Sequence, residues 1–526
     1  MSKYLQIIKS VFFPCLFLFV GLYLVPLRTF GPQFDSIPGD MGDSRFNNYL
    51  LEHGYRFVTG KVPHYWDAPY MFPQASVITF SDNLLGTLPV YAGARATGIS
   101  MESAFQCWIF ILFILNFLAC LYAMRKLGVN MAIASVSAYL FAFSQPIIGQ
   151  LNHLQLLPRF MIPLAFLWFI KWILDGNLKY MFLAMFAVVY QFYCGVYLGF
   201  MLSLCLGVFG IVYSLSTWVK NGFPWRFEKM YLLKCVGIAF AALVLLLPLM
   251  YPYYEQTLHF PMRSYEEVVP MLPRLSSYLS GMNGNWIWAF HSSTVDLLPV
   301  GWEHLMFPGG LTLLSFVLFP LFFSTLKNRL FTSYSFCAFI SLLILLALTL
   351  YYDGFSFYKQ VMKLPGFSSM RGITRISLVE IFLFILVMAS LMQLVWDSVK
   401  YKSLCFLYLF VFVIADHYVR SDNLYRYSKK KVQDRSSNLV NKIKSYNYSQ
   451  YKAFAYVPGP EENCNDVQLD AMLAGQQLGI TTVNGYSATS PTAYSNFWGL
   501  HNEESLKEWM LYSGITNYEK EILIVK

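Results

Sequence analysis

Charged residues are scarce in this sequence. Only 13% of its 526 residues are Asp, Glu, Lys or Arg, whereas 56% are hydrophobic and 18% are aromatic. An ordinary soluble domain carries roughly twice that charged fraction, so this chain is expected to fold in lipid rather than in water. The net charge of +9 does not predict nucleic-acid binding, because the Lys and Arg residues form short clusters between apolar runs, as positive-inside topology requires.

Paired cysteines and internal repeats are also missing. Eight of the nine cysteines lie in apolar segments without zinc-binding or redox spacing, which excludes a disulfide-rich or zinc-finger protein. The ninth, Cys464, is alone in the C-terminal part, so no disulfide is expected there. No small-residue cleavage site follows the apolar run from Ile7 to Val25, which indicates an uncleaved anchor. No similarity between halves is evident, which counts mildly against a transporter.

The main feature of the sequence is a series of long apolar segments. A helix needs about 20 apolar residues to cross the hydrocarbon core of a membrane. On this basis the sequence predicts a polytopic α-helical membrane protein with about eleven transmembrane helices. The predicted spans are 7–26, 102–124, 130–148, 154–174, 179–194, 196–219, 232–250, 305–326, 331–350, 373–396 and 403–418.

Basic residues set the predicted orientation of these spans. Clusters such as Arg125 and Lys126 recur in every second loop, and cytoplasmic loops carry an excess of Lys and Arg. The N-terminus is therefore expected in the cytoplasm, and the loop 27–101 is expected outside. Segment 84–97 is apolar but short and contains Gly, Pro and Arg, so we expect it to re-enter the membrane or to lie at its interface.

The same orientation divides the chain into two predicted domains. A transmembrane module covers 1–418, and a small α/β domain outside the membrane covers 419–526. Within the second domain, short apolar runs between turn-forming residues predict strands at 453–457 and 522–525.

The first outer loop begins with two acidic residues, Asp40 and Asp43, three positions apart. Apolar residues then recur at helical spacing and predict an amphipathic helix at 44–57 on the membrane surface. Asp43 is well placed as the N-cap of that helix, which would leave Asp40 free to accept a proton as a general base. A turn followed by a helix cap explains the same residues without any catalysis, and this alternative stays open.

A second group of polar residues lies at the outer ends of the spans. Arg159 enters the bilayer, where a charge usually needs a partner, while Arg371 and Arg375 break the positive-inside pattern. Guanidinium groups bind phosphate in a fork geometry, so these arginines are candidate ligands of an anionic lipid. Pairing with carboxylates such as Glu303 is the alternative. The other candidate substrate-binding residues are Arg45, His53, Asp82, Asn83, His153, Gln155, Gln191, Tyr193 and Glu303.

Several motifs follow one another in a specific order. They are GDxGDxRxNxxxLEH at 39–53, WDAPYMFPQ at 66–74, SDNLLG at 81–86, HLQLLPRF at 153–160, a Glu before FPG at 303–309, and LPGFxxMRxxxR at 364–375. This ordered set resembles a bacterial group within the GT-C superfamily, the multi-spanning glycosyltransferases that use polyprenyl-phosphate-linked sugars.

The resemblance implies a catalytic acid in the first outer loop, either Asp40 or Asp43. It also implies that basic residues hold the donor phosphate, and Arg159, Arg371 and Arg375 are the candidates. Other members have adjacent Asp and Glu residues in this loop, and their absence here leaves the identity of the base open. No cofactor follows from the sequence, and dependence on a divalent cation such as Mg or Mn stays open.

The implied activity is inverting transfer of a sugar from a polyprenyl-phosphate donor at the outer, periplasmic face of a bacterial cytoplasmic membrane. The acceptor in the cell envelope would be a glycan, a lipid or a protein. A carrier or flippase for a lipid-linked saccharide would use the same arginines without breaking a bond. A non-catalytic assembly factor that keeps only the GT-C scaffold is a third alternative.

Overall fold

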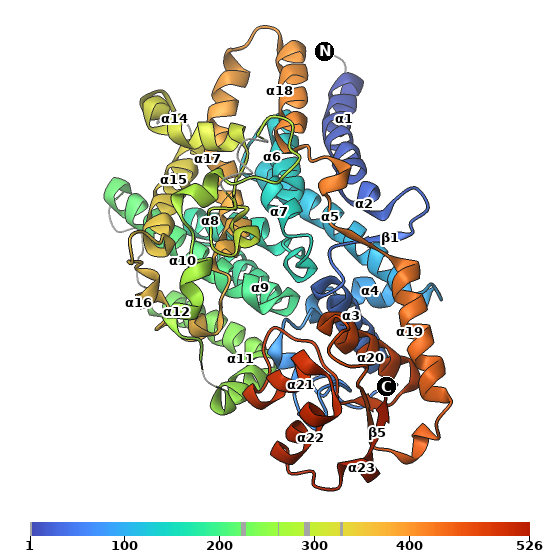
Figure 1. Ribbon diagram of the computed structural model, residues 1–526. Helices are drawn as coiled ribbons and strands as arrows, with labels where there is room; N and C mark the ends of the chain where they lie inside the picture. The colour runs from blue at the N-terminus through green and yellow to red at the C-terminus, as the bar shows by residue number, and fades with distance from the viewer. Residues whose placement is uncertain (1–2, 222–227, 261, 289–294, 327–329) are drawn as a thin grey trace.

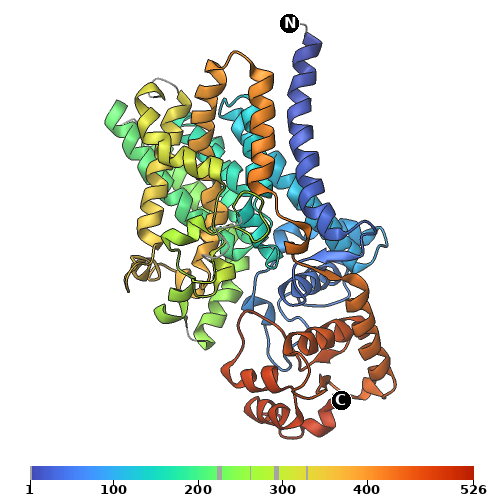
Figure 2. The same cartoon turned by 45° about the horizontal axis from the view of Figure 1, so that its top comes forward.

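The computed structural model describes residues 3–221, 228–260, 262–288, 295–326 and 330–526. A bundle of long helices occupies one end of the molecule and the C-terminal region, residues 419–526, occupies the other, as Figures 1 and 2 show. The main helices of the bundle are α1 (Lys3–Leu22), α2 (Arg28–Phe30), α5 (Met101–Lys126), α6 (Met131–Phe143), α7 (Gln145–Gly149), α8 (Met161–Asp175), α9 (Leu178–Cys194), α10 (Val196–Asn221), α11 (Lys229–His259), α14 (Gly310–Leu326), α15 (Leu330–Thr349), α17 (Ser377–Ser398) and α18 (Lys402–His417).

Each of the eleven predicted spans corresponds to a helix, but not all are long. Among the described residues, seven helices are long and apolar enough to cross a membrane: Val11–Phe30, Met101–Lys126, Met131–Gly149, Leu154–Asp175, Val196–Val219, Lys229–His259 and Ile373–Ser398. Three further apolar helices are shorter, and α18 has 16 residues. The chain is thus a multi-pass membrane protein, and the count of eleven spans stays a prediction.

The segment 84–97 does not form a long helix. It consists of a short 3-10 turn and α4 (Leu88–Ala96), which has nine residues and is about half the length that a span needs.

The centre of the bundle is formed by helices that are apolar on every side. Helix α6 is buried from Ala132 to Phe143, and α17 is buried from Ser377 to Leu391. Helix α11 is the opposite case, because only 6% of its most apolar stretch is buried within the protein. A helix that is hydrophobic all round needs either a protein core or lipid around it, so α11 is expected to face lipid.

The C-terminal region contains a small parallel sheet with strand order β4-β3-β5. Its strands β3 and β5 confirm the two strands predicted at 453–457 and 522–525. A further strand, β1 (Ser36–Pro38) of the first loop, pairs antiparallel with β2 and ties this region to the bundle. The elements of the region are β2 (Arg426–Ser428), α19 (Lys429–Lys444), β3 (Ala453–Tyr456), α20 (Cys464–Leu478), β4 (Thr481–Thr482), α21 (Ser495–Leu500), α22 (Glu503–Tyr512), α23 (Tyr518–Glu521) and β5 (Ile522–Val525).

Helix α3 (Asp43–Val58) carries most of the GDxGDxRxNxxxLEH motif. A helix was predicted here, and its side chains are buried within the protein from Ser44 to Gly54. Its expected place on the membrane surface stays a prediction. Helices α4 and α20 both pack against it. Its burial depends on α20, which is remote in the chain, and the amphipathic pattern of α3 alone does not show that partner.

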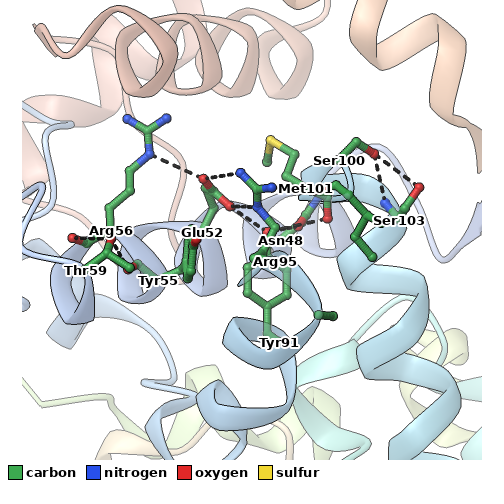
Figure 3. A network of polar contacts seen from close by, with 12 residues as sticks. Asn48, Glu52, Tyr55, Arg56, Thr59, Tyr91, Arg95, Ser100, Met101 and Ser103 are labelled. Carbon is green, nitrogen blue, oxygen red and sulfur yellow. Dashed lines mark hydrogen bonds and ion pairs between the residues drawn. The ribbon is translucent and has the colours of Figure 1, made fainter. Parts of the chain in front are cut away.

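Figure 3 shows the polar network that holds α3 against α4. The Glu52 carboxylate accepts hydrogen bonds from Arg95 Nε at 2.7 Å and from the Tyr91 hydroxyl at 2.9 Å. One turn further along α3, Arg56 Nε lies 3.5 Å from Glu52 Oε1. The buried carboxylate is therefore balanced by two guanidinium groups, and these contacts fix the position of α3 on α4.

Candidate functional site

The two acidic residues of the first loop do not occupy the positions predicted for them at the start of the helix. The N-cap of α3 is Gly42, and Asp43 is the first residue of the helix. Asp40 Oδ1 accepts hydrogen bonds from the backbone N–H of Gly42 at 3.1 Å and of Ser44 at 3.4 Å. The prediction that Asp43 caps the helix while Asp40 stays free is therefore wrong. The loop turns back at Gly39, where φ is +101°, and this turn brings Asp40 to the start of the helix.

Asp40 is nevertheless perturbed by its surroundings. Loss of solvation and the neighbouring Asp43 carboxylate raise its pKa, while the backbone N–H groups of Ser44 and Gly42 oppose that rise. Its side chain is at the surface of the loop, and the hydrogen bonds that it accepts come from the chain around it.

The Asp43 carboxylate points instead toward side chains from two distant parts of the chain. Its Oδ1 accepts a hydrogen bond of 2.6 Å from the Tyr486 hydroxyl. Its Oδ2 lies 3.4 Å from Gln155 Nε2 and 3.5 Å from His153 Nε2. Burial and the charge of Asp43 raise the pKa of Tyr486, so its phenol stays protonated and donates.

An ion pair lies on the other side of His153. Glu303, in the 3-10 turn Gly301–His304, accepts hydrogen bonds from Arg375 Nε at 3.1 Å and from Arg375 Nη2 at 2.7 Å. Burial alone would raise the pKa of Glu303, but Arg375 outweighs it and lowers this pKa to about 2. His153 Nε2 is 3.7 Å from Glu303 Oε1. Burial and the charge of Arg375 lower the pKa of His153, which favours its neutral form.

Arg371 differs from Arg375 in its exposure and its partners. Its side chain is exposed, and among the described residues it makes no ion pair or hydrogen bond. Its charge nevertheless acts on both Glu303 and His153, so it lies near the same group. Arg371 therefore has donors available for an anion, whereas Arg375 is committed to a buried carboxylate.

Asp82 is a further carboxylate near this group. Its Oδ1 accepts a hydrogen bond of 3.4 Å from the backbone N–H of Tyr197, and the Tyr197 ring lies 5.3 Å from the Arg375 guanidinium carbon. Burial raises the pKa of Asp82 to about 6, with the charge of Arg375 lowering it and that of Asp43 raising it. The structure thus gathers predicted residues from four separate loops. The members of this polar cluster are Asp43, Asp82, His153, Gln155, Glu303, Arg371, Arg375 and Tyr486.

Arg159, the third predicted phosphate ligand, does not join the polar cluster. It is fully buried, and its guanidinium donates to the carbonyl groups of Phe141 at 2.9 Å and Leu378 at 3.4 Å. The guanidinium carbon also lies 4.8 Å from the centre of the Phe141 ring. The cavity beside it measures about 10 Å³, which is room for roughly one water.

Five other predicted substrate-binding residues make contacts that hold the fold together. Each bonds to a backbone group or to an oppositely charged side chain rather than to the polar cluster. These contacts join Arg45 to Asp466 and Asp470, His53 to the Tyr65 carbonyl, Asn83 to the Phe192 carbonyl, Gln191 to the Pro158 carbonyl, and Tyr193 to the Leu245 carbonyl.

Tyr486 was not identified from the sequence. It follows Gly485 in a polar loop after β4, and no spacing or charge pattern marks it. Only the packing of the C-terminal region on α3 brings its hydroxyl to Asp43.

The described carboxylates of the polar cluster do not form a metal site built from three protein side chains. Within the described ranges, no three His, Cys, Asp or Glu side chains lie close enough to hold one metal ion. Glu303 is already paired with Arg375. Because Mg²⁺ usually takes only one or two protein carboxylates together with substrate phosphates, dependence on a divalent cation stays open.

Comparisons with known proteins inform the fold. No protein-family model and no curated protein sequence matches the chain. Among solved structures, arabinofuranosyltransferase AftD from mycobacteria is 16% identical with a TM-score of 0.46, covering 85% of this chain and 30% of that chain. Two crystal structures of the Archaeoglobus fulgidus oligosaccharyltransferase are 12% identical. The TM-score is 0.48 for its complex with Zn and sulfate, covering 92% of this chain and 63% of that one.

For the apo form of the same oligosaccharyltransferase, the TM-score is 0.50 and the coverage is 92% of this chain and 65% of that one. This chain therefore spans less than two thirds of the length of each of these proteins. The likeness to the apo structure supports a shared fold for these two chains.

Proposed function

We propose that this protein is a glycosyltransferase that moves a sugar from a polyprenyl-phosphate donor to an acceptor at the outer face of a bacterial cytoplasmic membrane. One observation carries the proposal: Asp43, a carboxylate on α3, lies 3.5 Å from His153, and the charge of Arg371 acts on the same histidine. Among the described residues, the exposed Arg371 side chain has no ion-pair partner. A transferase of this kind needs both groups, one to accept a proton and one to bind a departing phosphate.

The proposed reaction is a single displacement with inversion. The acceptor hydroxyl attacks the anomeric carbon as its proton passes to Asp43, and the bond between that carbon and the phosphate oxygen breaks. The lipid phosphate leaves as an anion, which Arg371 binds directly. Arg375 holds Glu303 in place and contributes positive charge nearby. The neutral His153 lies between the Asp43 and Glu303 carboxylates and keeps the Asp43 carboxylate oriented.

Asp43 is preferred to Asp40 as the base. Asp40 Oδ1 accepts two backbone hydrogen bonds that cap α3, whereas Asp43 faces the side chains that surround the proposed phosphate site. A general base must lie within reach of the proton that it removes, and Asp43 meets this condition better.

The location and the partners belong to the same proposal. Clusters of Lys and Arg in alternate loops favour a cytoplasmic N-terminus and a periplasmic polar cluster and C-terminal region. The acceptor would be a glycan, a lipid or a protein of the cell envelope. The carrier alternative calls for polar side chains along a path between the two faces, but Arg159 and Gln191 are bonded to backbone carbonyls inside the bundle.

The test is transfer of radiolabel from a panel of polyprenyl-phosphate sugars in membranes that contain the wild type, Asp43→Asn or Asp40→Asn at equal expression. Asp43→Asn is expected to lower the transfer rate by about 100- to 10,000-fold with donor binding retained, since general base catalysis contributes that much. Asp40→Asn is the matched control from the same loop and should stay within about tenfold of the wild type, because its carboxylate serves as a helix cap.

Two results would contradict the proposal. Undiminished transfer by Asp43→Asn would remove Asp43 as the base. If no donor supports transfer, but lipid-linked saccharide binds and crosses the bilayer in an Arg371-dependent way, the protein is a carrier.

A further inference from the structure

A separate cavity of about 190 Å³ lies between the C-terminal region and the first long loop. Met71 of the first loop forms one wall, and Thr489, Ser490, Ser495 and Trp498 of the C-terminal region form much of the rest. Helix α21 carries the last two of these residues, and it lies beside the first loop in Figure 1. None of the residues to which the proposed transfer assigns a role lines this cavity.

The lining has the composition of a site for a neutral polyhydroxylated group. It contains hydroxyl groups and one indole ring but no charged side chain. In the part of the chain that the structure describes, the Ser490 and Ser495 hydroxyls and the Trp498 indole N–H have no hydrogen-bond partner. These groups can donate to sugar hydroxyls, and the two serines can also accept from them. The half-buried indole offers an apolar face for the C–H side of a sugar ring.

The cavity is connected to the polar cluster through the chain itself. Ser487, which also lines the cavity, directly follows Tyr486, and the Tyr486 hydroxyl donates to Asp43 Oδ1 at 2.6 Å. The preceding residue, Gly485, is packed so closely on Met71 that a Cβ there would lie 2.5 Å from the Met71 Cγ. A group bound in the cavity would therefore lie next to the short segment that contacts the proposed base.

A third loop contacts two of the residues that line the cavity. Arg263 Nη2 donates to the Thr489 hydroxyl at 3.0 Å and to the Ala488 carbonyl at 3.4 Å. Arg263 also pairs with Glu267 at 3.4 Å, so its charge is partly balanced. Three separate parts of the chain thus shape the cavity, which makes its position dependent on the complete fold.

We infer that this cavity binds a saccharide unit of the acceptor. Hydrogen bonds from Ser490 and Ser495 and contact with the Trp498 ring hold the sugar. The adjacent segment at Tyr486 directs its attacking hydroxyl toward Asp43. The role as acceptor rests on the proposed glycosyl transfer, whereas saccharide binding by the cavity stands on its lining alone.

The experiment measures binding by tryptophan fluorescence and by calorimetry on the full-length protein in detergent. The probes are neutral disaccharides of glucose, galactose, mannose and N-acetylglucosamine, together with a short peptide that contains Ser, Thr and Asn. At least one disaccharide is expected to bind and to change the fluorescence. The double variant Ser490→Ala/Ser495→Ala should weaken its affinity by about 10-fold or more, since it removes two hydrogen bonds.

Control variants separate the cavity from the rest of the protein. Trp498→Phe should abolish the fluorescence change and weaken binding in calorimetry. Ser513→Ala, in the same region but outside the cavity, should bind like the wild type. The inference is overturned if no disaccharide binds, if the double variant binds as well as the wild type, or if only the peptide binds in a way that depends on the cavity.

The transfer assay distinguishes failure of this inference from failure of the proposed function. If transfer occurs but the serine variants leave the acceptor KM unchanged, the glycosyltransferase proposal stands and the cavity assignment fails. If disaccharides bind in the cavity but no donor supports transfer, the cavity is a saccharide site and the proposed enzyme activity fails.

Discussion

The two ends of the buried part of α3 differ in how their charges are balanced. Toward its C-terminal end, the Glu52 carboxylate forms ion pairs with Arg95 and Arg56. At its N-terminal end, Asp43 makes one short hydrogen bond to Tyr486, while its other contacts with charged or amide groups are 3.4 Å or longer. Carboxylates that are paired with guanidinium groups hold a helix in position. A carboxylate that makes only one short hydrogen bond can still accept a proton.

A second closed pair lies on the same helix. Arg45 is buried and binds Asp466 at 3.0 Å as well as Asp470, so it joins α3 to α20. Within one motif of 15 residues, some charged groups therefore attach the C-terminal region, others attach α4, and Asp43 is left facing the polar cluster. Removing a paired charge should therefore lower stability, whereas removing an unpaired charge should mainly affect the proposed reaction.

The largest effect on stability is expected when the buried ion pair of Arg45 is broken. Arg45→Ala leaves Asp470 buried with only Arg435 as a partner, and breaking a buried ion pair costs about 3 to 5 kcal/mol. Thermal unfolding in detergent measures the loss, and limited proteolysis of the C-terminal region should accelerate. The matched control is Arg420→Ala, since Arg420 pairs with Asp422 at the surface and should change stability by about 1 kcal/mol at most. Equal melting temperatures of the two variants would show that the Arg45 ion pair does not stabilise the fold.

Asp82, in the polar cluster, should give the opposite change in stability, because its substitution is expected to stabilise the protein. The folded-state pKa of Asp82 is raised from 3.8 to about 6, so its ionised form is disfavoured in the folded protein. Its contribution to stability is present below the unfolded pKa and is lost as the pH rises through about 6. Asp82→Asn is thus expected to stabilise the protein by up to about 3 kcal/mol near neutral pH. The gain should vanish below about pH 4, and a gain independent of pH would contradict this account.

Removing the unpaired arginine should affect the donor rather than the fold. Arg371→Ala is expected to raise the KM for a polyprenyl-phosphate sugar by about 10- to 100-fold, as for a lost hydrogen bond to a charged group. The melting temperature should not change, because the side chain is exposed. Lys363→Ala removes the same charge from an exposed position in the same loop and should leave this KM within about twofold of the wild type. A similar rise in both variants would mean that only net charge matters.

The smallest effect is expected at the single short hydrogen bond of Asp43. Tyr486→Phe removes the hydroxyl that donates to Asp43 Oδ1 and should lower kcat by about 2- to 10-fold with the donor KM unchanged. Tyr446→Phe, at an exposed tyrosine of the same region, is the control. A higher kcat in Tyr486→Phe would mean that the tyrosine blocks the base rather than orienting it.

Local patterns in the sequence predicted some features of the site and not others. His153 and Glu303 were identified as polar residues at the outer ends of apolar runs. Arg375 was identified because it breaks the positive-inside pattern. Their contact with one another was not predicted, since they come from different loops. Asp43 was assigned as the N-cap because only spacing was visible. The N-cap is in fact Gly42, and the backbone turn at Gly39 places the Asp40 carboxylate where it accepts hydrogen bonds from Gly42 and Ser44.

The sequence by itself determined that this chain folds in a membrane, where its helices lie, and that β3 and β5 form, because each depends on hydrophobicity over a few neighbouring residues. Only the tertiary structure decided that α3 is buried by α20 and that Tyr486 reaches Asp43. It also decided that Arg159 binds backbone carbonyls inside the bundle, whereas the charge of Arg371 acts on Glu303. These outcomes depend on contacts between segments hundreds of residues apart, and a local sequence pattern does not predict which charged side chains will be paired.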